Sequence, residues 1–173
     1  MLSKQDLDYL RGISVFAGLE EPILDQIGSY ARYIETTGDQ VLLEQGVPAK
    51  EMLVVIEGRL AVIKRNEAGA EACLATLGPG SLAGEMSLID IQPRSAEVRS
   101  IGPAKVIALS HGDIASIYRE DLKSYTLLVL NIAREISLRL RRLDNLLATL
   151  TFAIGEATHP SWSESPTVPH VGK

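Results

Sequence analysis

In the segment from Gly84 to Ala96, a carboxylate, a permanent cation, a hydroxyl and a glycine converge within a few residues: Gly-Glu-Met-Ser-Leu-Ile-Asp-Ile-Gln-Pro-Arg-Ser-Ala. Arg94 is planar and always charged, so it can donate two parallel hydrogen bonds to anionic oxygens, and Ser95 adds a hydroxyl donor beside it. Glu85, once ionised, only accepts hydrogen bonds, which suits the hydroxyl groups of a sugar. Gly84 lets the backbone turn without a Cβ, so that the following amides can approach an anion closely. Together these groups fit a ribose fused to a cyclic phosphodiester.

The same residues allow a simpler interpretation, in which the segment forms two surface turns and Arg94 is neutralised by Asp90 or Glu97. Exposed ion pairs of this kind are common and contribute little to stability. If residues 86–89 instead form a helical turn, its N-terminus adds a favourable partial positive charge for an anion. The surrounding chain has to decide between the two interpretations.

The surrounding sequence resembles the cyclic nucleotide-binding domain of Crp/Fnr-like catabolite-activator regulators, kinase regulatory subunits and cyclic-nucleotide-gated channels. In that family the phosphate-binding cassette reads Gly-Glu-Leu/Met-Ala/Ser-Leu, then several residues, then Pro-Arg-Ser/Thr/Ala-Ala. The matching residues are Gly84, Glu85, Met86, Ser87, Leu88, Pro93, Arg94, Ser95 and Ala96, and we call residues 84–96 the cassette. Residues 16–19, 38–46, 54–58 and 77–80 are similar to the family's first helical turn, opening hairpin and internal turns. The resemblance covers about residues 10–150.

The resemblance implies that the cassette holds the phosphate of cAMP or cGMP and that Glu85 holds the ribose. It further implies that Val62, Leu74 and Leu77 face the sugar and base, with ordinary core packing as their alternative. In activator-type relatives, hydroxyl residues midway along a long helix contact the purine, and Arg139 lies at about that place, where its guanidinium could stack on the base. Ser95 could favour a guanine, while family frequency favours cAMP. The implied ligand-binding residues are therefore Gly84, Glu85, Met86, Ser87, Arg94, Ser95, Ala96, Val62, Leu74, Leu77 and Arg139, with no catalytic or metal-binding residue.

Hydrophobic periodicity predicts helices on both sides of a β-rich region. Helices are expected at 4–10, 21–31, 113–120 and 122–152, and strands at 40–43, 52–56, 59–65, 71–77, 96–100 and 105–110. Short strands separated by glycine-containing turns indicate a barrel, roll or sandwich. With the resemblance, we expect a mainly β, jelly-roll-like β-roll (double-stranded β-helix) with short N-terminal helices and a long C-terminal helix. Cys73, the only cysteine, is expected to be a small buried side chain on a strand.

The long predicted helix carries an apolar seam at alternating spacings of four and three residues, the pattern of helices that pair along one stripe. The seam consists of Val129, Ala133, Ile136, Leu140, Leu143, Leu147 and Leu150. A helix that packs only on its own roll would also need an apolar face. However, Leu138 and Leu146 add a second apolar side, which favours a homodimer through this helix.

Length and composition indicate one domain followed by a tail. The chain has 173 residues with 46% hydrophobic content, enough for a core over residues 1–152. Residues 153–173 are rich in proline, serine and threonine, include Trp162, and are expected to be disordered. The N-terminus lacks an apolar signal core and no membrane-length apolar run is present, so we expect a cytoplasmic protein.

Direct DNA binding is not expected. The formal net charge is −5, whereas nucleic-acid-binding domains usually carry a basic surplus. The tail is too short and too proline-rich for the helix-turn-helix domain that follows the sensor in transcriptional activators. The long helix does carry a basic cluster, but acidic residues interrupt it and a solvated face explains it better. The cluster consists of Arg134, Arg139, Arg141 and Arg142, interrupted by Glu135 and Asp144.

The leading hypothesis is a non-enzymatic sensor that couples nucleotide binding to movement of the C-terminal helix and reports to an unidentified protein partner. Similar rolls host metal-dependent enzymes, but these need clustered His and carboxylate ligands, and this chain has only His111, His159 and His170. The same shortage of ligands disfavours a haem or redox sensor. The remaining alternatives are a degenerate roll that binds proteins or associates with a transcription regulator, and a receptor for a larger cyclic dinucleotide.

Overall fold

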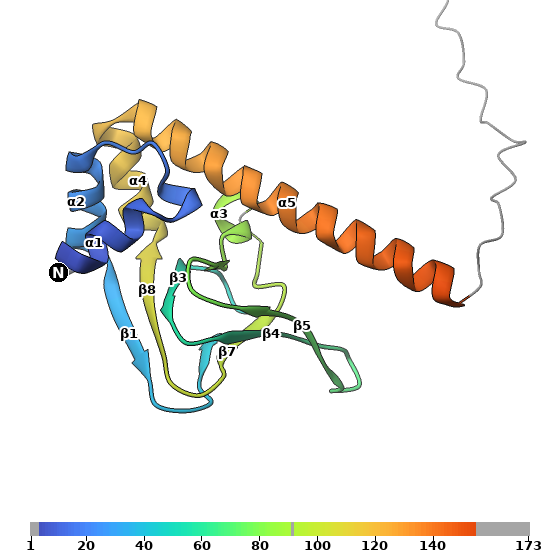
Figure 1. Ribbon diagram of the computed structural model, residues 1–173. Coiled ribbons are helices and arrows are strands. Elements are labelled where there is room, and N and C mark those ends of the chain that lie inside the picture. Colours follow the sequence, from blue (N-terminus) through green and yellow to red (C-terminus); the bar gives the residue numbers. More distant parts are fainter. Residues whose placement is uncertain (1–3, 91, 155–173) are drawn as a thin grey trace, which may run out of the picture. The chain divides into compact units, whose positions relative to one another are not determined.

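The computed structural model describes residues 4–90 and 92–154, which form helices and two antiparallel sheets (Figure 1). The helices are α1 (Lys4–Arg11), the 3-10 helix η1 (Ser14–Phe16), α2 (Glu21–Tyr30), α3 (Met86–Asp90), α4 (His111–Glu120) and α5 (Leu122–Ile154). The strands are β1 (Arg32–Thr36), β2 (Val41–Leu43), β3 (Glu51–Glu57), β4 (Leu60–Arg65), β5 (Glu71–Leu77), β6 (Leu82–Ala83), β7 (Glu97–Ser100) and β8 (Ala104–Ser110).

The predicted β-roll with flanking helices is confirmed. Each sheet has four strands, in the orders β1-β8-β3-β6 and β2-β7-β4-β5, and every pairing is antiparallel. The sequence did not predict β1 or β6, because β1 is rich in polar residues and β6 is only two residues long. The chain divides into two compact units, residues 1–136 and 137–173, so α5 contributes to both.

Strands β3 and β8 are buried on both faces, which explains why their sequences are apolar almost throughout. In β3, Met52, Val54 and Ile56 belong to a core shared with the helices, which we call the helix core. Leu53 and Val55 belong to a second core between the two sheets, which we call the roll core. Side chains alternate across a strand, so one continuous apolar run supplies both cores. Strand β8 divides between the cores in the same way.

The helices of the first unit gather at one end of β1 and β8 (Figure 1). Helix α4 begins at His111, two residues earlier than predicted, because Ser110 and Asp113 form a reciprocal capping box that satisfies the first backbone donors. Within residues 122–136 of α5, the fully buried side chains are Leu128 and Ile132. These two were not part of the predicted seam.

A buried amide anchors the start of α5 to the N-terminal helices. Asn131 is 2% exposed, and its Nδ2 donates to the backbone carbonyls of Val15 at 3.1 Å and Ala17 at 2.9 Å. The hydroxyl of Ser14 donates to the carboxylate of Glu135 at 2.6 Å. Hydrogen bonds that satisfy a buried amide restrict its position strongly, since losing one leaves a desolvated polar group.

The expectation that Cys73 is buried is wrong. It lies exposed on β5, which is the outer strand of its sheet. All residues of β5 except Leu77 are exposed. The hairpin loop itself forms as expected, closed by a 3.0 Å hydrogen bond from the Gly69 amide to the Asn66 carbonyl.

The second unit comprises, among the described residues, the part of α5 from Ser137 to Ile154. Its leucines and its phenylalanine are exposed, at 43–72% of their maximal areas. They are Leu138, Leu140, Leu143, Leu146, Leu147, Leu150 and Phe152. The helix continues two residues beyond its predicted end, and the expected tail with Trp162 lies outside the described residues from residue 155 onward.

The close packing of the turn between β3 and β4 can be tested by substituting its glycine. Gly58 has φ +79°, and a Cβ there would come well within 3.0 Å of the Pro103 carbonyl and of Ala104. Gly69 has φ +81° but nothing within 4 Å. We expect Gly58→Ala to lower the free energy of unfolding by about 3 kcal/mol or more, and Gly69→Ala by about 1 kcal/mol. Chemical denaturation measures both; equal losses would contradict the close approach at Gly58.

Candidate functional site

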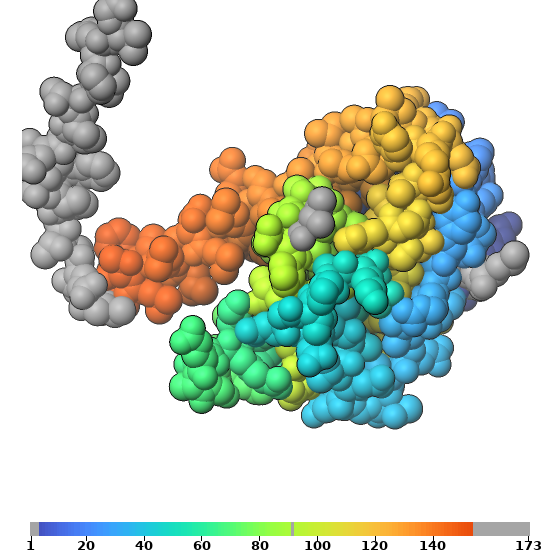
Figure 2. Space-filling view, turned by 180° about the vertical axis from the view of Figure 1, so that it is seen from behind, coloured from blue at the N-terminus to red at the C-terminus, as the bar shows by residue number. Residues whose placement is uncertain are grey.

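The cassette begins at Gly84, directly after β6, includes α3, and ends at Ala96, directly before β7. Its far end is pinned to the turn after β2 by two backbone hydrogen bonds: the Gly46 amide donates to the Arg94 carbonyl at 2.9 Å, and the Arg94 amide donates to the Val47 carbonyl at 3.0 Å. Figure 2 shows residues of the cassette, in yellow-green, at the surface beside those of α4, in yellow. The helical turn considered for residues 86–89 is present as α3.

Arg94 is buried rather than displayed on a surface turn. Its side chain is 7% exposed, and its guanidinium donates to the backbone carbonyl of Gly84 at 3.3 Å and to that of Glu51. Glu97 instead forms ion pairs with Arg65 and Arg99. Among the described residues, Arg94 forms no ion pair with Asp90 or Glu97, so the interpretation of two surface turns with Arg94 neutralised by Asp90 or Glu97 is wrong.

The guanidinium of Arg94 can lie where it does because Gly84 has no side chain. A Cβ on Gly84 would come well within 3.0 Å of a terminal nitrogen of Arg94, and the φ of Gly84 is +78°. Both the backbone conformation and the close approach require glycine here. The Gly84 carbonyl also accepts the Ser87 hydroxyl at 3.4 Å, which ties α3 to the same turn.

Burial and two nearby carboxylates act in opposite directions on the charge of Arg94. Burial lowers the pKa of the Arg94 guanidinium, while the carboxylates of Glu51 and Glu85 oppose that shift. Two neutral carbonyls accept from a desolvated cation, so a phosphate group placed against it would gain a strong charge-assisted interaction. Glu85 is 1% exposed, so its carboxylate also lies in the interior, close enough to influence Arg94.

The other predicted site residues lie in different environments. Within the cassette, Ser87 is buried, Met86 and Ser95 are exposed, and Ala96 is intermediate. On the β4–β5 hairpin, Leu77 is buried in the roll core, Val62 packs against that core, and Leu74 is 55% exposed. Arg139 belongs to the second unit, outside the unit that contains the cassette. The ligand contacts predicted for these residues stay predictions.

Two groups that support the cassette were not predicted from the sequence. The first is the backbone of Glu51, Gly46 and Val47, whose role has no sequence signal because any residue supplies a carbonyl or an amide. The second is the cluster around Glu97, which lies buried between Arg65 and Arg99 directly after the cassette. Alternation along β4 and β7 could have indicated this cluster: Glu97 is opposite Ile63, so Arg65 lies two residues further along β4 at a diagonal position, and Arg65 is opposite Glu71 on β5.

The described residues were also compared with the requirements of a metal site and of a membrane-spanning helix. In residues 4–90 and 92–154, no group of three or more His, Cys, Asp and Glu side chains is arranged to hold a metal ion. No helix within this part of the chain combines the length and apolarity needed to cross a membrane.

Comparisons with known proteins agree with this geometry. Residues 34–121 match the family described as cyclic nucleotide-binding domain. The "Cyclic AMP receptor protein" of Thermus thermophilus is 30% identical over 143 residues, which is 83% of this chain and 64% of that relative. The chain thus spans just under two thirds of the length of the first curated relatives it matches.

Solved structures are similar over the same region. The crystal structure of the Thermus thermophilus Catabolite Activator Protein superposes with a TM-score of 0.67 at 30% identity, covering 80% of this chain and 63% of that one. A cyclic nucleotide-binding domain from Methylobacillus flagellatus KT superposes with a TM-score of 0.73 at 25% identity, covering 83% and 81%.

The contact between Gly84 and Arg94 can be tested with two matched glycine substitutions. Gly80 also has a positive φ, +81°, but nothing lies within 4 Å of the position of a Cβ there. We expect Gly84→Ala to displace the Arg94 guanidinium, moving its side-chain NMR signals, whereas Gly80→Ala leaves them in place. Unchanged Arg94 signals in a folded Gly84→Ala protein would contradict the described packing.

Proposed function

The chain belongs to the cyclic nucleotide-binding domain family, and on that premise we propose that it is a non-enzymatic sensor of a cyclic mononucleotide, cAMP or cGMP. The observation that carries the proposal is Arg94, a buried cation whose guanidinium donates only to backbone carbonyls in the described hydrogen bonds. A structural role alone does not explain this burial, because desolvating a cation is costly. A cyclic phosphodiester against Arg94 would offset that cost.

The remaining contacts of the proposed complex follow from the cassette. Glu85 would accept a hydrogen bond from the ribose 2′-hydroxyl, since an ionised carboxylate cannot donate. The hydroxyl of Ser95 would add a donor to the phosphate or to a guanine. Val62, Leu74 and Leu77 would line the sugar and base, and Arg139 would stack on the purine. Gly84, Met86, Ser87 and Ala96 would shape the phosphate cradle.

We further propose that the signal passes through α5. Its first part is anchored by Asn131 to the N-terminal helices, and side chains of α3 and α5 meet in the helix core and its margin, where Leu88 and Ile136 both pack. A nucleotide that shifts α3 would bias the packing of α5, provided it binds the two arrangements with different affinity. The read-out would be an unidentified protein partner or a second copy of the chain.

Other functions find less support. The first curated relatives that the chain matches carry the names of cyclic AMP-responsive regulators and of cyclic nucleotide-gated channels, and these names favour a sensor over an enzyme. A degenerate roll used only for protein contacts would have no reason to bury Arg94 beside Glu85. We propose a cytoplasmic protein without direct DNA binding, with residues 1–152 as the sensor domain and residues 153–173 as its tail.

Calorimetric titration with cAMP, cGMP and cyclic di-GMP tests the ligand. We expect heat with a cyclic mononucleotide and weaker or no binding of cyclic di-GMP, because the cassette offers one buried cation. Arg94→Ala should weaken binding by about 100-fold or more, since it removes a charge-assisted contact inside a desolvated site.

The matched control is Arg119→Ala, which removes an exposed arginine whose guanidinium contacts only the nearby Ser116 in the described hydrogen bonds. This variant should bind within about twofold of the unmodified protein. If no nucleotide gives heat after removal of co-purified ligand, the sensor proposal fails. Equal affinity of the two arginine variants would remove Arg94 from the proposed site.

We propose that the exposed seam of α5 forms a homodimer. Between residues 137 and 154, Leu140, Leu143, Leu147 and Leu150 are all at least half exposed. Leucines that repeat at the a and d positions of a helix form an apolar stripe, and a second helix with the same stripe can cover it. Leu138 and Leu146, which are also exposed, lie on the adjacent face of the helix and would widen the same interface.

Light scattering tests the dimer. The double variant Leu140→Asp, Leu147→Asp should be monomeric, because it places carboxylates inside the proposed seam. The control, Asn145→Asp with Thr149→Asp, adds the same charge on the opposite side of the helix and should leave the mass at two chains. A monomeric parent protein, or an unchanged mass in the leucine variant, would refute the seam.

A further inference from the structure

Lys64, on β4, lies on the inner face of the roll, beside the cassette. Side chains on one face of a strand recur every two residues, so Lys64 shares the face of Leu60 and Val62. That face packs in the roll core, to which Leu60 belongs and against which Val62 lies. Val62 is opposite Val98 on β7. The same register, continued by two residues, brings Lys64 beside Ala96, the last residue of the cassette.

The ammonium group of Lys64 contacts the cassette directly. Its Nζ donates a hydrogen bond to the backbone carbonyl of Ser95, the residue that follows Arg94. Both Lys64 and Ser95 are exposed, so a solute can reach the ammonium group. The hydrogen bond holds a long side chain at the end of the cassette, which lowers the conformational entropy that the side chain would lose on binding a ligand.

No carboxylate neutralises Lys64. In residues 4–90 and 92–154 it forms no ion pair, and its described hydrogen bond goes to a neutral carbonyl. The next residue, Arg65, differs, since its guanidinium forms ion pairs with Glu71 and Glu97. An inward-pointing charge can protect the edge of a sheet, but β4 lies between β7 and β5 and is not an edge strand. Edge protection therefore does not explain Lys64.

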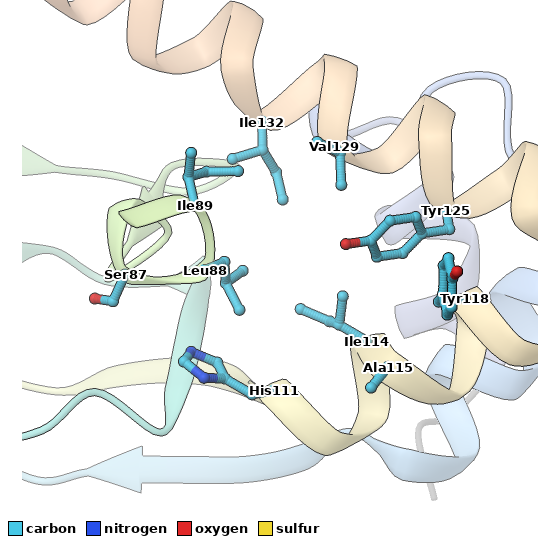
Figure 3. Close-up of a pocket in the computed structure, with 10 residues that line it drawn as sticks. All are labelled: Ser87, Leu88, Ile89, His111, Ile114, Ala115, Tyr118, Tyr125, Val129 and Ile132. Carbon is cyan, nitrogen blue, oxygen red and sulfur yellow. The ribbon is translucent and has the colours of Figure 1, made fainter. Parts of the chain in front are cut away.

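His111, a second basic side chain near Arg94, cannot provide a further positive charge for a ligand. Figure 3 shows His111 at a cavity between α3, α4 and the beginning of α5, on the side of Leu88 and Ile114. Burial lowers the pKa of its imidazole, and the positive charge of Arg94 lowers that pKa further, so the ring is neutral at pH 7. Its Nε2 is buried and inaccessible. Lys64, by contrast, is both charged and accessible.

We propose that Lys64 is a second cation of the nucleotide site, which binds one exocyclic oxygen of the cyclic phosphate while Arg94 binds the other. This inference rests on the proposed function, because it concerns the same ligand. A cyclic phosphodiester has two exocyclic oxygens that share one negative charge. Arg94 is buried within the cassette and Lys64 is exposed at its end, so each cation would serve a different oxygen. The ammonium group would exchange the Ser95 carbonyl for a charged and therefore stronger acceptor.

Calorimetric titration of the full chain with cAMP and cGMP tests this role. Lys64→Met keeps the length of the side chain but removes its charge, and should weaken binding about fivefold, since the contact is accessible to water. Lys64→Arg should recover most of that loss. Lys4→Met is the matched control, because Lys4 is exposed on α1 and forms no ion pair among the described residues. Its affinity should stay within about twofold of the unmodified protein.

The two phosphorothioate diastereomers of the bound nucleotide distinguish a phosphate contact from a structural effect. Each replaces one exocyclic oxygen by sulfur, which accepts hydrogen bonds more weakly, so each should bind the unmodified protein less tightly than the parent nucleotide does. In Lys64→Met, one diastereomer should lose this penalty, because no donor faces its sulfur any longer, whereas the other keeps it. A change in packing alone would affect both diastereomers alike.

Two results would overturn the role of Lys64 and leave the sensor proposal intact. The first is equal affinity of Lys64→Met and Lys4→Met for a nucleotide that Arg94→Ala fails to bind. The second is a diastereomer preference that Lys64→Met leaves unchanged. If the unmodified protein binds neither cAMP nor cGMP, the sensor proposal itself fails, and the role of Lys64 fails with it.

Discussion

The buried guanidinium of Arg94 is the interaction on which the arrangement of the cassette depends. Its hydrogen bonds to the carbonyls of Gly84 and Glu51 connect the first turn of the cassette to the beginning of β3. Backbone hydrogen bonds at Arg94 connect the far end of the cassette to Gly46 and Val47. A buried guanidinium can still gain a charge-assisted hydrogen bond from an anion that reaches it. The same side chain therefore organises the loop and, in the proposed complex, binds the phosphate.

Strand β3 links that site to the rest of the first unit. It starts at Glu51, whose carbonyl receives Arg94, and its alternating side chains supply both the roll core and the helix core. The helix core also contains Leu128 and Ile132 from the beginning of α5. A displacement at the cassette would thus meet a densely packed interior that responds by discrete repacking rather than by continuous deformation. This packing gives a physical route from the proposed ligand to α5.

The sequence predicted elements well and exposure poorly. The apolar runs of β3 and β8 and the periodic pattern of α5 were predicted from the sequence. The polar β1 and the two-residue β6 were not. Cys73 and Leu74 lie on a strand with the expected sequence pattern, yet both are exposed because β5 is an outer strand. The periodicity of α5 likewise indicated an apolar stripe without separating Leu128, which is fully buried, from Leu140, which is 57% exposed. Side-chain pattern reports which residues can be buried, and the positions of neighbouring elements decide which of them are.

The sequence by itself determined the chemistry available to this protein. The residue types and spacing of the cassette, with a glycine at residue 84 and an arginine at residue 94, could be identified without coordinates because those groups are chemically distinctive. Only the tertiary structure decided that the glycine makes room for the guanidinium of Arg94, that Glu97 is engaged by Arg65 and Arg99, and that backbone carbonyls hold the cation. The reason is physical: every residue has a carbonyl, so its role depends on where the fold places it. The cavity beside His111 is of the same kind, since its walls come from three helices that are separate in the sequence.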